Sequence, residues 1–449
     1  MNVPEFLTKL KVFQNQLIKF IENKENTDEN YQSILNILFD QQIINDIYVF
    51  KLTLHLIVNI SNNRHRNLNF FDKIDQILRF LKNKISERMS NSEIFTIFKS
   101  SKRLLLFLIE EEIIKVDEYI VKNMTLNDFV DKNYPEYFAP EIKPFITEQF
   151  INTYKANNRI VEKPKWIKFV SKELPENFNE KRKQAENDSF ICRLIREDNV
   201  KEFVKHITPI DLTFNSLISP SIFETNSFLI KSEHVTLLEY ALFFGSMKII
   251  NYFIGKGAEL IHNLFFYAIH SQNINLIQKF EEYEEPYHQL RLELIRCHHN
   301  NLVNFFENNY SFYENEDIVF YESIKSYNFA YIKSSFINEN YLHLFCEFDY
   351  ISFVEFLLNE KKVDVNNTDI IYVFNHVQYS FFPISFNNKN RMKFIFIYFF
   401  RTPLYLAVKE ENIELIKLLL SYENLNIIKA TTVLLNFSIS FNYLFDGIL

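Results

Sequence analysis

The sequence predicts an all-α protein in which a helical N-terminal domain precedes a solenoid of degenerate helix pairs. Three observations support this fold class: apolar residues recur at helical spacing through residues 1–150, segments after residue 187 resemble one another, and only 4 of the 449 residues are glycine. Phosphate-binding loops, nucleophile elbows and dinucleotide turns are built on glycine. The positions of these four glycines exclude the G-x-G-x-x-G, Walker A and G-x-S-x-G motifs.

The composition is that of a globular protein, with 47% hydrophobic and 24% charged residues. A chain of 449 residues is longer than one hydrophobic core usually needs, which indicates several domains or an extended array. The formal net charge of −8 argues against nucleic-acid binding that depends on overall positive charge. We therefore expect no nucleic-acid partner.

A cytoplasmic location without a membrane partner is expected. Cys192, Cys297 and Cys346 lie far apart in a long chain, which fits a reducing compartment rather than a disulfide framework. Residues 1–10 lack the apolar core of a signal peptide. The apolar run at residues 394–400 is far shorter than the roughly 20 residues that span a bilayer.

Residues 1–150 are predicted to form the helical N-terminal domain. The first helix has an apolar face made by residues three and four positions apart: Phe6, Leu10, Phe13, Leu17 and Ile21. Ser90 and Glu93 form a capping-box pattern that predicts the start of another helix. Residues 47–57 fit both strand alternation and a helical face, and the helix is favoured because no turn or partner strand lies nearby.

A linker is predicted at residues 151–186. Prolines at positions 135, 140 and 144 interrupt the helical pattern, and a charged stretch follows them. Trp166 lies inside the linker and is expected to anchor it on a neighbouring surface.

Beyond residue 187 the chain repeats a short motif that ends on a small or apolar residue. The clear copies are Thr236-Leu-Leu-Glu-Tyr-Ala241, Asn263-Leu-Phe-Phe-Tyr-Ala268, Asn340-Tyr-Leu-His-Leu-Phe345 and Thr402-Pro-Leu-Tyr-Leu-Ala407. A branched apolar residue follows each copy nine positions later: Ile250, Ile277, Val354 and Ile416. Weaker copies end at Leu294 and Ser323. Self-similarity of this kind predicts a solenoid.

The last clear copy resembles the ankyrin repeat. Residues 402–407 match the pattern T-P-L-H-x-A with one aromatic replacement, and residues 414–420 match the second helix of the family. Thr402 can cap the first helix, Pro403 has the φ that the first helical residue needs, and Ala407 permits close helix approach. The residues that define the repeat in this resemblance are Ala241, Gly245, Gly257, Ala268, Thr402, Pro403, Leu404 and Ala407.

More narrowly, the chain resembles the degenerate ankyrin proteins that are expanded in some A/T-rich protists. The resemblance implies degenerate repeats at residues 187–366 and a clear repeat at residues 401–427. Residues 367–400 break the register between them, and residues 428–449 form an atypical tail. The first segment is either an insertion that docks a partner or, like the tail, read-through of non-coding sequence in the gene model.

No catalytic, cofactor-binding or metal-binding residue is predicted. Cys297, His298 and His299 form a dense group of metal-ligand types. Adjacent residues of a helix diverge by about 100 degrees, so these three are interpreted as ordinary repeat surface. The stretch Gly255-Lys-Gly257 resembles a phosphate loop only superficially, because the residues after it match the ankyrin turn.

The resemblance implies a non-enzymatic scaffold or adaptor that binds protein partners of unknown identity. Solenoids offer their first helices and connecting loops to partners through aromatic anchors. The candidate contacts lie in or just after the first-helix motifs: Phe243, Phe244, Tyr267 and Phe348. The alternative is a substrate-recruiting subunit of a ligase or kinase complex, in which residues 1–150 contact the catalytic partner.

Overall fold

The structure is a computed structural model of the chain. It describes residues 3–23, 28–64, 69–125, 133–158, 164–232, 234–280, 287–309, 316–359, 363–366, 369–370, 400–422 and 425. Residues 428–449 and most of residues 367–400, the tail and the break predicted above, lie outside this range.

The fold is all-α, as predicted. The described residues contain 26 α-helices, and their strands are limited to β1 (Asp369–Ile370) and β2 (Phe400–Arg401). The helices that precede the helix pairs are α1 (Val3–Glu22), α2 (Asp28–Asp40), α3 (Ile47–Asn63), α4 (Phe70–Arg88), α5 (Asn91–Phe98), α6 (Lys102–Glu110), α7 (Glu118–Met124), α8 (Tyr134–Tyr137), α9 (Ala139–Ile142), α10 (Glu148–Asn158), α11 (Lys165–Val170) and α12 (Phe178–Gln184). No helix in the described ranges is long and apolar enough to cross a membrane.

The N-terminal helices follow the local signals of the sequence. The five apolar residues predicted to share one face of α1 are at most 2% exposed. Ser90 and Glu93 form the predicted capping box at the start of α5. Residues 47–63 form the helix α3 rather than a strand. Phe50, Leu52 and Leu54 are all buried, although they point to different sides of the helix. The strand-like alternation of apolar residues therefore arises because α3 is covered on several sides.

The chain forms two compact units, and each is discontinuous in sequence. Unit 1 contains residues 1–14, 40–53 and 314–449, and unit 2 contains residues 15–39 and 54–313. Both α1 and α3 contribute residues to both units. Each unit therefore combines N-terminal helices with helix pairs from the later part of the chain. The predicted division at residues 151–186 into parts that fold separately stays a prediction.

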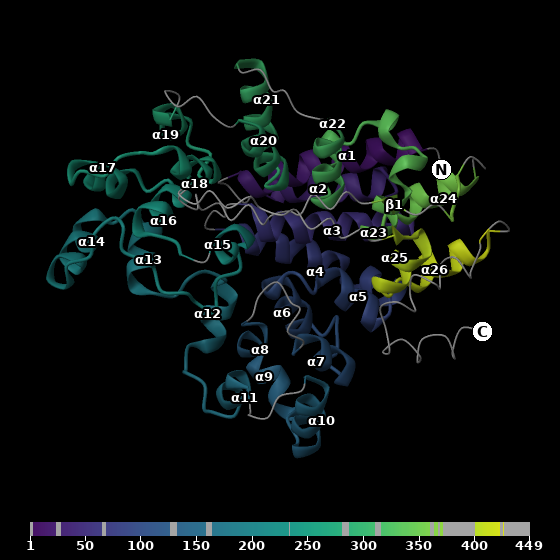
Figure 1. The fold of residues 1–449 in the computed structure, drawn as a ribbon, viewed down its shortest axis with the longest axis horizontal. Helices are drawn as coiled ribbons and strands as arrows, with labels where there is room; N and C mark the ends of the chain where they lie inside the picture. The colour runs from purple at the N-terminus through teal and green to yellow at the C-terminus, as the bar shows by residue number, and fades with distance from the viewer. Residues whose placement is uncertain are drawn as a thin grey trace, which may run out of the picture. The chain divides into compact units, whose positions relative to one another are not determined.

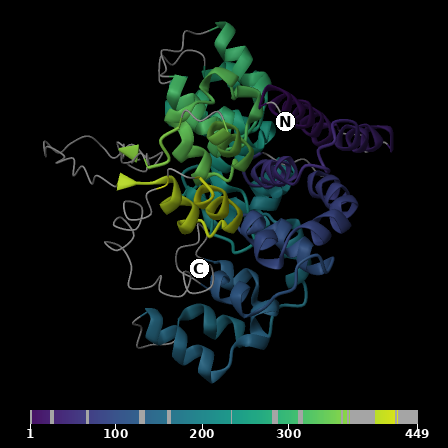
Figure 2. The same ribbon diagram turned by 90° about the vertical axis from the view of Figure 1, so that its right-hand side faces the viewer.

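The stretch predicted as a linker contains α11, α12 and most of α10. Trp166 is 7% exposed, and its ring meets that of Tyr154 edge-on with 5.4 Å between centroids. Helices α8, α9 and α11 pack together in unit 2, in the group of blue helices at the bottom of Figure 2. The tryptophan thus anchors this stretch within a small helical group.

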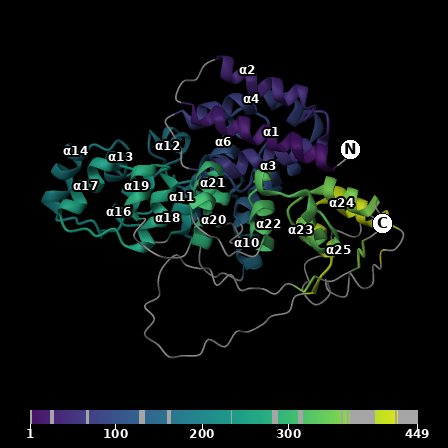
Figure 3. The same ribbon diagram turned by 90° about the horizontal axis from the view of Figure 1, so that it is seen from above.

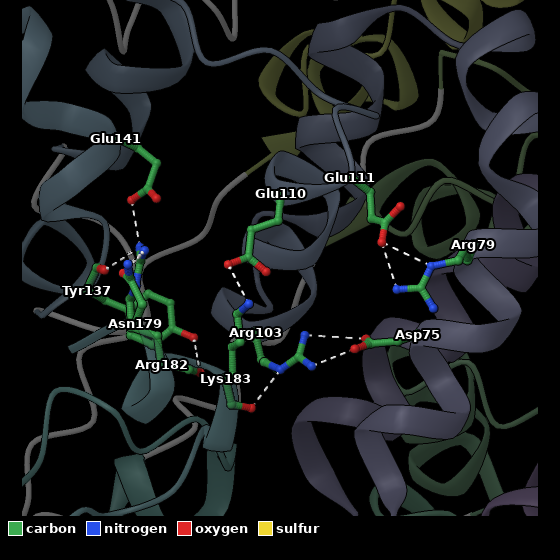
Figure 4. A network of polar contacts seen from close by, with 10 residues as sticks. All are labelled: Asp75, Arg79, Arg103, Glu110, Glu111, Tyr137, Glu141, Asn179, Arg182 and Lys183. Atoms are coloured by element: carbon green, nitrogen blue, oxygen red, sulfur yellow. Dashed lines mark hydrogen bonds and ion pairs between the residues drawn. The ribbon is translucent and has the colours of Figure 1, made fainter. Parts of the chain in front are cut away.

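Two arginines bind α12 to the helices before it (Figure 4). Arg103 of α6 donates from Nη2 to Oδ2 of Asp75 at 2.6 Å and from Nε to the carbonyl oxygen of Lys183 at 2.9 Å. Arg182 donates from Nη1 to Oε2 of Glu141 at 2.7 Å. Both guanidinium groups are largely buried, so each depends on its carboxylate partner for charge balance.

Seven helix pairs follow, each with a first helix, a turn and a second helix (Figure 1). In order they are α13 (Phe190–Arg196) with α14 (Val200–Ile207), α16 (Leu237–Phe244) with α17 (Met247–Gly255), α18 (Phe265–His270) with α19 (Ile274–Ile277), α20 (Tyr287–Arg296) with α21 (Asn300–Asn309), α22 (Glu316–Lys325) with the 3₁₀ helix η5 (Phe329–Tyr331), α23 (Leu342–Glu347) with α24 (Ile351–Asn359), and α25 (Pro403–Lys409) with α26 (Ile413–Leu420). The short helix α15 (Ser227–Lys231) precedes α16.

The first helices pack in succession within each unit. Unit 2 holds the first four helix pairs, where α13, α16, α18 and α20 follow one another (Figure 3). Unit 1 holds the last three, where α22 packs on α23 and α23 on α25. This succession of first helices is the arrangement of a solenoid. The helix pairs also contact the N-terminal helices within each unit, as in the edge-on contact of Phe353 in α24 with Phe6 in α1.

The same backbone turn joins the two helices of every pair. Four residues after the aligned motif residue, φ lies between +47° and +65° at Asp198, Gly245, Gln272, His298, Tyr327, Asp349 and Glu411. The residue nine positions after the motif residue is at most 4% exposed in every pair: Phe203, Ile250, Ile277, Val303, Ile332, Val354 and Ile416. This regularity confirms the weaker copies at Leu294 and Ser323 and adds a first copy at Leu194.

Hydrogen bonds of the Schellman type close this turn. In the second pair, the N–H of Ser246 donates to the carbonyl of Ala241 at 3.0 Å, and that of Gly245 to the carbonyl of Leu242 at 3.1 Å. A Cβ atom at Gly245 would lie 2.9 Å from Cβ of Ser271 in the third pair. The positive φ favours glycine here, and the close approach of the next helix pair leaves no room for a Cβ atom.

The sixth and seventh helix pairs are spatial neighbours despite a long separation in sequence. Their motif residues, Phe345 and Ala407, are 62 positions apart (407 − 345), yet α23 packs on α25. The amide of Asn412 also donates to Oδ1 of Asp349. Asp369 pairs with Arg401 in the β1–β2 ladder, so the chain returns beside the place where it leaves.

Candidate functional site

The four candidate contact residues divide into two groups by exposure. Phe243 and Tyr267 are 1% and 4% exposed, whereas Phe244 and Phe348 are half-buried. A side chain that is almost fully covered has no area to offer a partner. The structure therefore does not support Phe243 and Tyr267 as contacts, because both face the packed interior: their rings lie 6.0 and 5.0 Å from that of Phe228.

Phe244 and Phe348 occupy the same position in their helix pairs, three residues after the motif residue and directly before the left-handed turn. A second exposed apolar position that two helix pairs share was not predicted from the sequence. Ile274 and Ile413, each the first residue of a second helix, are 49% and 50% exposed. Their common signal is an isoleucine six positions after Ala268 or Ala407, at the start of the second helix.

The repeat-defining residues hold the geometry of the helix pairs. Ala241, Ala268 and Ala407 are 0% exposed and lie inside α16, α18 and α25, which pack on neighbouring first helices. Gly257 has a φ of +90° and ends α17 with the same pair of turn hydrogen bonds as Gly245. The sequence around it therefore forms a helix end rather than a phosphate loop.

The seventh helix pair has the start that its motif predicts. The side chain of Thr402 accepts a hydrogen bond from the N–H of Tyr405, and Pro403 occupies the first helical position. Leu404 is 1% exposed and belongs to the core.

In both units, polar side chains of α1 and α3 reach the turns of the helix pairs. In unit 2, Arg64, directly after α3, donates to the carbonyl oxygens of Cys297 and His298 at 3.2 and 2.6 Å and pairs with Glu22. In unit 1, Gln14 of α1 bonds to Asn328. Side chains from the N-terminal part of the chain thus form hydrogen bonds with a turn of the helix pairs in each unit.

A buried polar cluster lies between the third and fourth helix pairs of unit 2. His270, the last residue of α18, has Nδ1 3.7 Å from Sγ of Cys297. Cys297, His298 and His299 are 0%, 0% and 2% exposed. The interpretation of these three residues as repeat surface is wrong, because they form the turn between α20 and α21 and the neighbouring helix pair covers that turn.

The electrostatics of this cluster do not favour a nucleophilic cysteine. Burial raises the pKa of Cys297, and so does the charge of Glu293, whose Oε1 lies 3.3 Å from the sulfur. Burial also raises the pKa of Glu293, but Arg296 and the hydrogen bond with His270 outweigh it and lower that pKa to about 2. The carboxylate thus stays charged while the thiol stays protonated, the reverse of an activated cysteine.

Residues 400–430 match the family model of the ankyrin repeat. The match covers the seventh helix pair, gives the chain ankyrin-repeat character and supports a role in protein–protein interaction in general. No curated protein and no solved structure matches the chain.

Proposed function

We propose that this protein is a non-enzymatic scaffold or adaptor that binds a protein partner through its helix pairs, in the cytoplasm and without nucleic acid or cofactor. The observation that carries the proposal is the turn that recurs in seven helix pairs, because stacked helix pairs of this kind form the extended surfaces through which solenoids bind partners. Phe244 and Phe348 are half-buried at one such position, where a partner could cover the rest of each ring.

Exposed isoleucines strengthen the proposal. Ile274 and Ile413 lie at the surface in equivalent positions, as apolar side chains that the chain itself leaves half exposed. Apolar and aromatic anchors of this kind supply most of the binding energy in protein interfaces. The net charge of −8 gives no support to nucleic-acid binding.

The test compares two variants of the full chain by proximity labelling in the native cell. One variant carries Phe244→Ser and Phe348→Ser together. The other carries Phe39→Ser, which removes an aromatic residue that is 53% exposed in α2, outside the helix pairs. We expect the double variant to lose specific protein partners and the Phe39 variant to keep them.

The same experiment separates the proposal from its alternative. If the wild-type chain retrieves a ligase or kinase catalytic subunit that the Phe39 variant loses and the double variant keeps, the recruiting-subunit function replaces the scaffold. An identical partner set in all three samples would contradict contact through Phe244 and Phe348. Robust turnover by the purified chain in a broad hydrolase and transferase screen would contradict both functions.

A further inference from the structure

Three side chains with metal-ligand atoms meet inside unit 2. The ligand atoms of His270, Cys297 and His299 all lie within 4.8 Å of one another. The three side chains come from two neighbouring helix pairs and are at most 2% exposed. We propose that His270, Cys297 and His299 bind a Zn²⁺ ion between the third and fourth helix pairs.

The left-handed turn brings Cys297 and His299 together. Cys297 directly follows α20, His298 has a φ of +58°, and His299 directly precedes α21. Within a helix, two residues two positions apart would point about 200 degrees apart. Here the chain reverses at His298, so the side chains on either side of it face the same space, where His270 also points.

The observed spacing is close to that of a zinc site. With Zn–S about 2.3 Å and Zn–N about 2.0 Å, tetrahedral ligand atoms lie about 3.5 Å apart. The distance from Nδ1 of His270 to Sγ of Cys297 is 3.7 Å. The ligand atom of His299 lies within 4.8 Å of both, so it must move closer when the ion binds. A water molecule can complete four-coordination, as it does at zinc sites with three protein ligands.

The donor set selects the class of metal. One thiolate and two imidazole nitrogens suit Zn²⁺ and exclude Mg²⁺ and Ca²⁺, which take oxygen ligands. On binding, the thiol of Cys297 gives up its proton to solvent and the sulfur forms the bond to zinc. The thiolate then offsets one of the two charges of the ion, while the nearby Glu293 carboxylate also pairs with Arg296.

Glu293 is a positioning residue in this arrangement. Its Oε1 lies 3.5 Å from Nε2 of His270, whereas the other ring nitrogen, Nδ1, faces the sulfur of Cys297. A carboxylate that accepts from one ring nitrogen leaves the other nitrogen unprotonated and free to bind a metal. The rings of Phe228 and Phe243, 4.2 and 4.8 Å from that of His270 between centroids, pack against the imidazole and limit water access.

The test uses Co²⁺ as a spectroscopic substitute for Zn²⁺, added to the full chain after chelator treatment and under a thiol reductant. We expect the visible bands of tetrahedral Co²⁺ together with a near-ultraviolet thiolate-to-cobalt band, and loss of both when one equivalent of Zn²⁺ is added. Cys297→Ser should remove the thiolate band. The matched control is Cys346→Ser, another buried cysteine, which lies in unit 1 and should leave the spectrum unchanged.

A second variant tests the positioning role. Glu293→Gln should keep the thiolate band but weaken Co²⁺ binding by about 10- to 100-fold, because the ligands remain and only the orienting carboxylate is lost. Absence of both bands in the wild-type chain would overturn the proposal whether or not the variants fold, and would leave His270, Cys297 and His299 as a metal-free buried cluster. An unchanged thiolate band in Cys297→Ser would also overturn it.

Discussion

The amide of Gln14 in α1 donates a 2.6 Å hydrogen bond from Nε2 to Oδ1 of Asn328, the residue that follows the turn of the fifth helix pair. Its Oε1 accepts from the N–H of Ala330 at 3.2 Å. Both Gln14 and Asn328 are 0% exposed. One side chain near the start of the chain therefore satisfies a donor and an acceptor of a turn more than 300 residues away, within unit 1.

Replacement of Gln14 by alanine should destabilise unit 1. The change leaves the buried amide of Asn328 and the N–H of Ala330 without this partner, at a cost of about 1–3 kcal/mol. Urea unfolding monitored by circular dichroism measures the effect. The control is Gln16→Ala, on the same helix with the same helix propensity, whose amide bonds to the less buried Ser33. Equal losses in the two variants would contradict the role of Gln14.

Gly245→Ala should be strongly destabilising. The positive φ at this turn disfavours any Cβ atom, and that atom would meet Cβ of Ser271 at 2.9 Å. Strain and overpacking together should cost roughly 2–4 kcal/mol in the free energy of unfolding.

Gly255→Ala is the matched control for that substitution. Gly255 ends α17, and a Cβ atom there would have no neighbour within 4 Å. This variant should be neutral or up to about 1 kcal/mol more stable, because alanine favours the helix. A Gly245 variant as stable as the Gly255 variant would show that the turn accommodates a side chain.

The contribution of Glu293 to stability should depend on pH. The pKa of this carboxyl is lowered to about 2 in the folded chain, against an ordinary value of 4.5, so its charged form stabilises the fold above pH 4.5. That contribution, of order 3 kcal/mol, should be lost progressively as the pH falls from about 5 towards 2. The measurement is the unfolding free energy of wild type and Glu293→Gln in chelator, whose difference should shrink with acidification. A constant difference across this range would show that Glu293 does not titrate with folding.

The three cysteines should resist modification in the native chain. All are buried, and burial raises the pKa of Cys192 to about 11 and also raises that of Cys346. Little thiolate is therefore present near neutral pH, and a disulfide reagent has no access to the sulfur. We expect slow labelling under native conditions and rapid labelling of three thiols after denaturation. Fast native labelling at one cysteine would locate a site that opens locally.

Local signals predicted the helices and the helix pairs. The apolar face of α1, the capping box at Ser90 and the cap at Thr402 all depend on residues a few positions apart. Such patterns are local in the sequence, so they can be recognised without knowledge of any tertiary contact. The same holds for the motif residue and the branched residue nine positions later, whose spacing is that of two helices joined by a short turn.

The buried cluster could not be predicted in this way. Treating Cys297 and His299 as residues of one helix places their side chains on different faces, and only the positive φ of His298 reverses the chain between them. Five further helix pairs carry a non-glycine residue at the equivalent position, so residue type alone gave no signal of the turn.

The sequence by itself determined the all-α class, the positions of six of the seven helix pairs and the ankyrin-type motif of the last one, because helix periodicity, caps and repeat spacing are local properties. The tertiary structure alone decided that Gln14 and Arg64 bond to turns of the helix pairs, that Phe243 and Tyr267 are buried, and that His270 meets Cys297 and His299. These outcomes depend on which surfaces cover one another, and burial between distant segments is set by packing of the folded chain rather than by spacing along it.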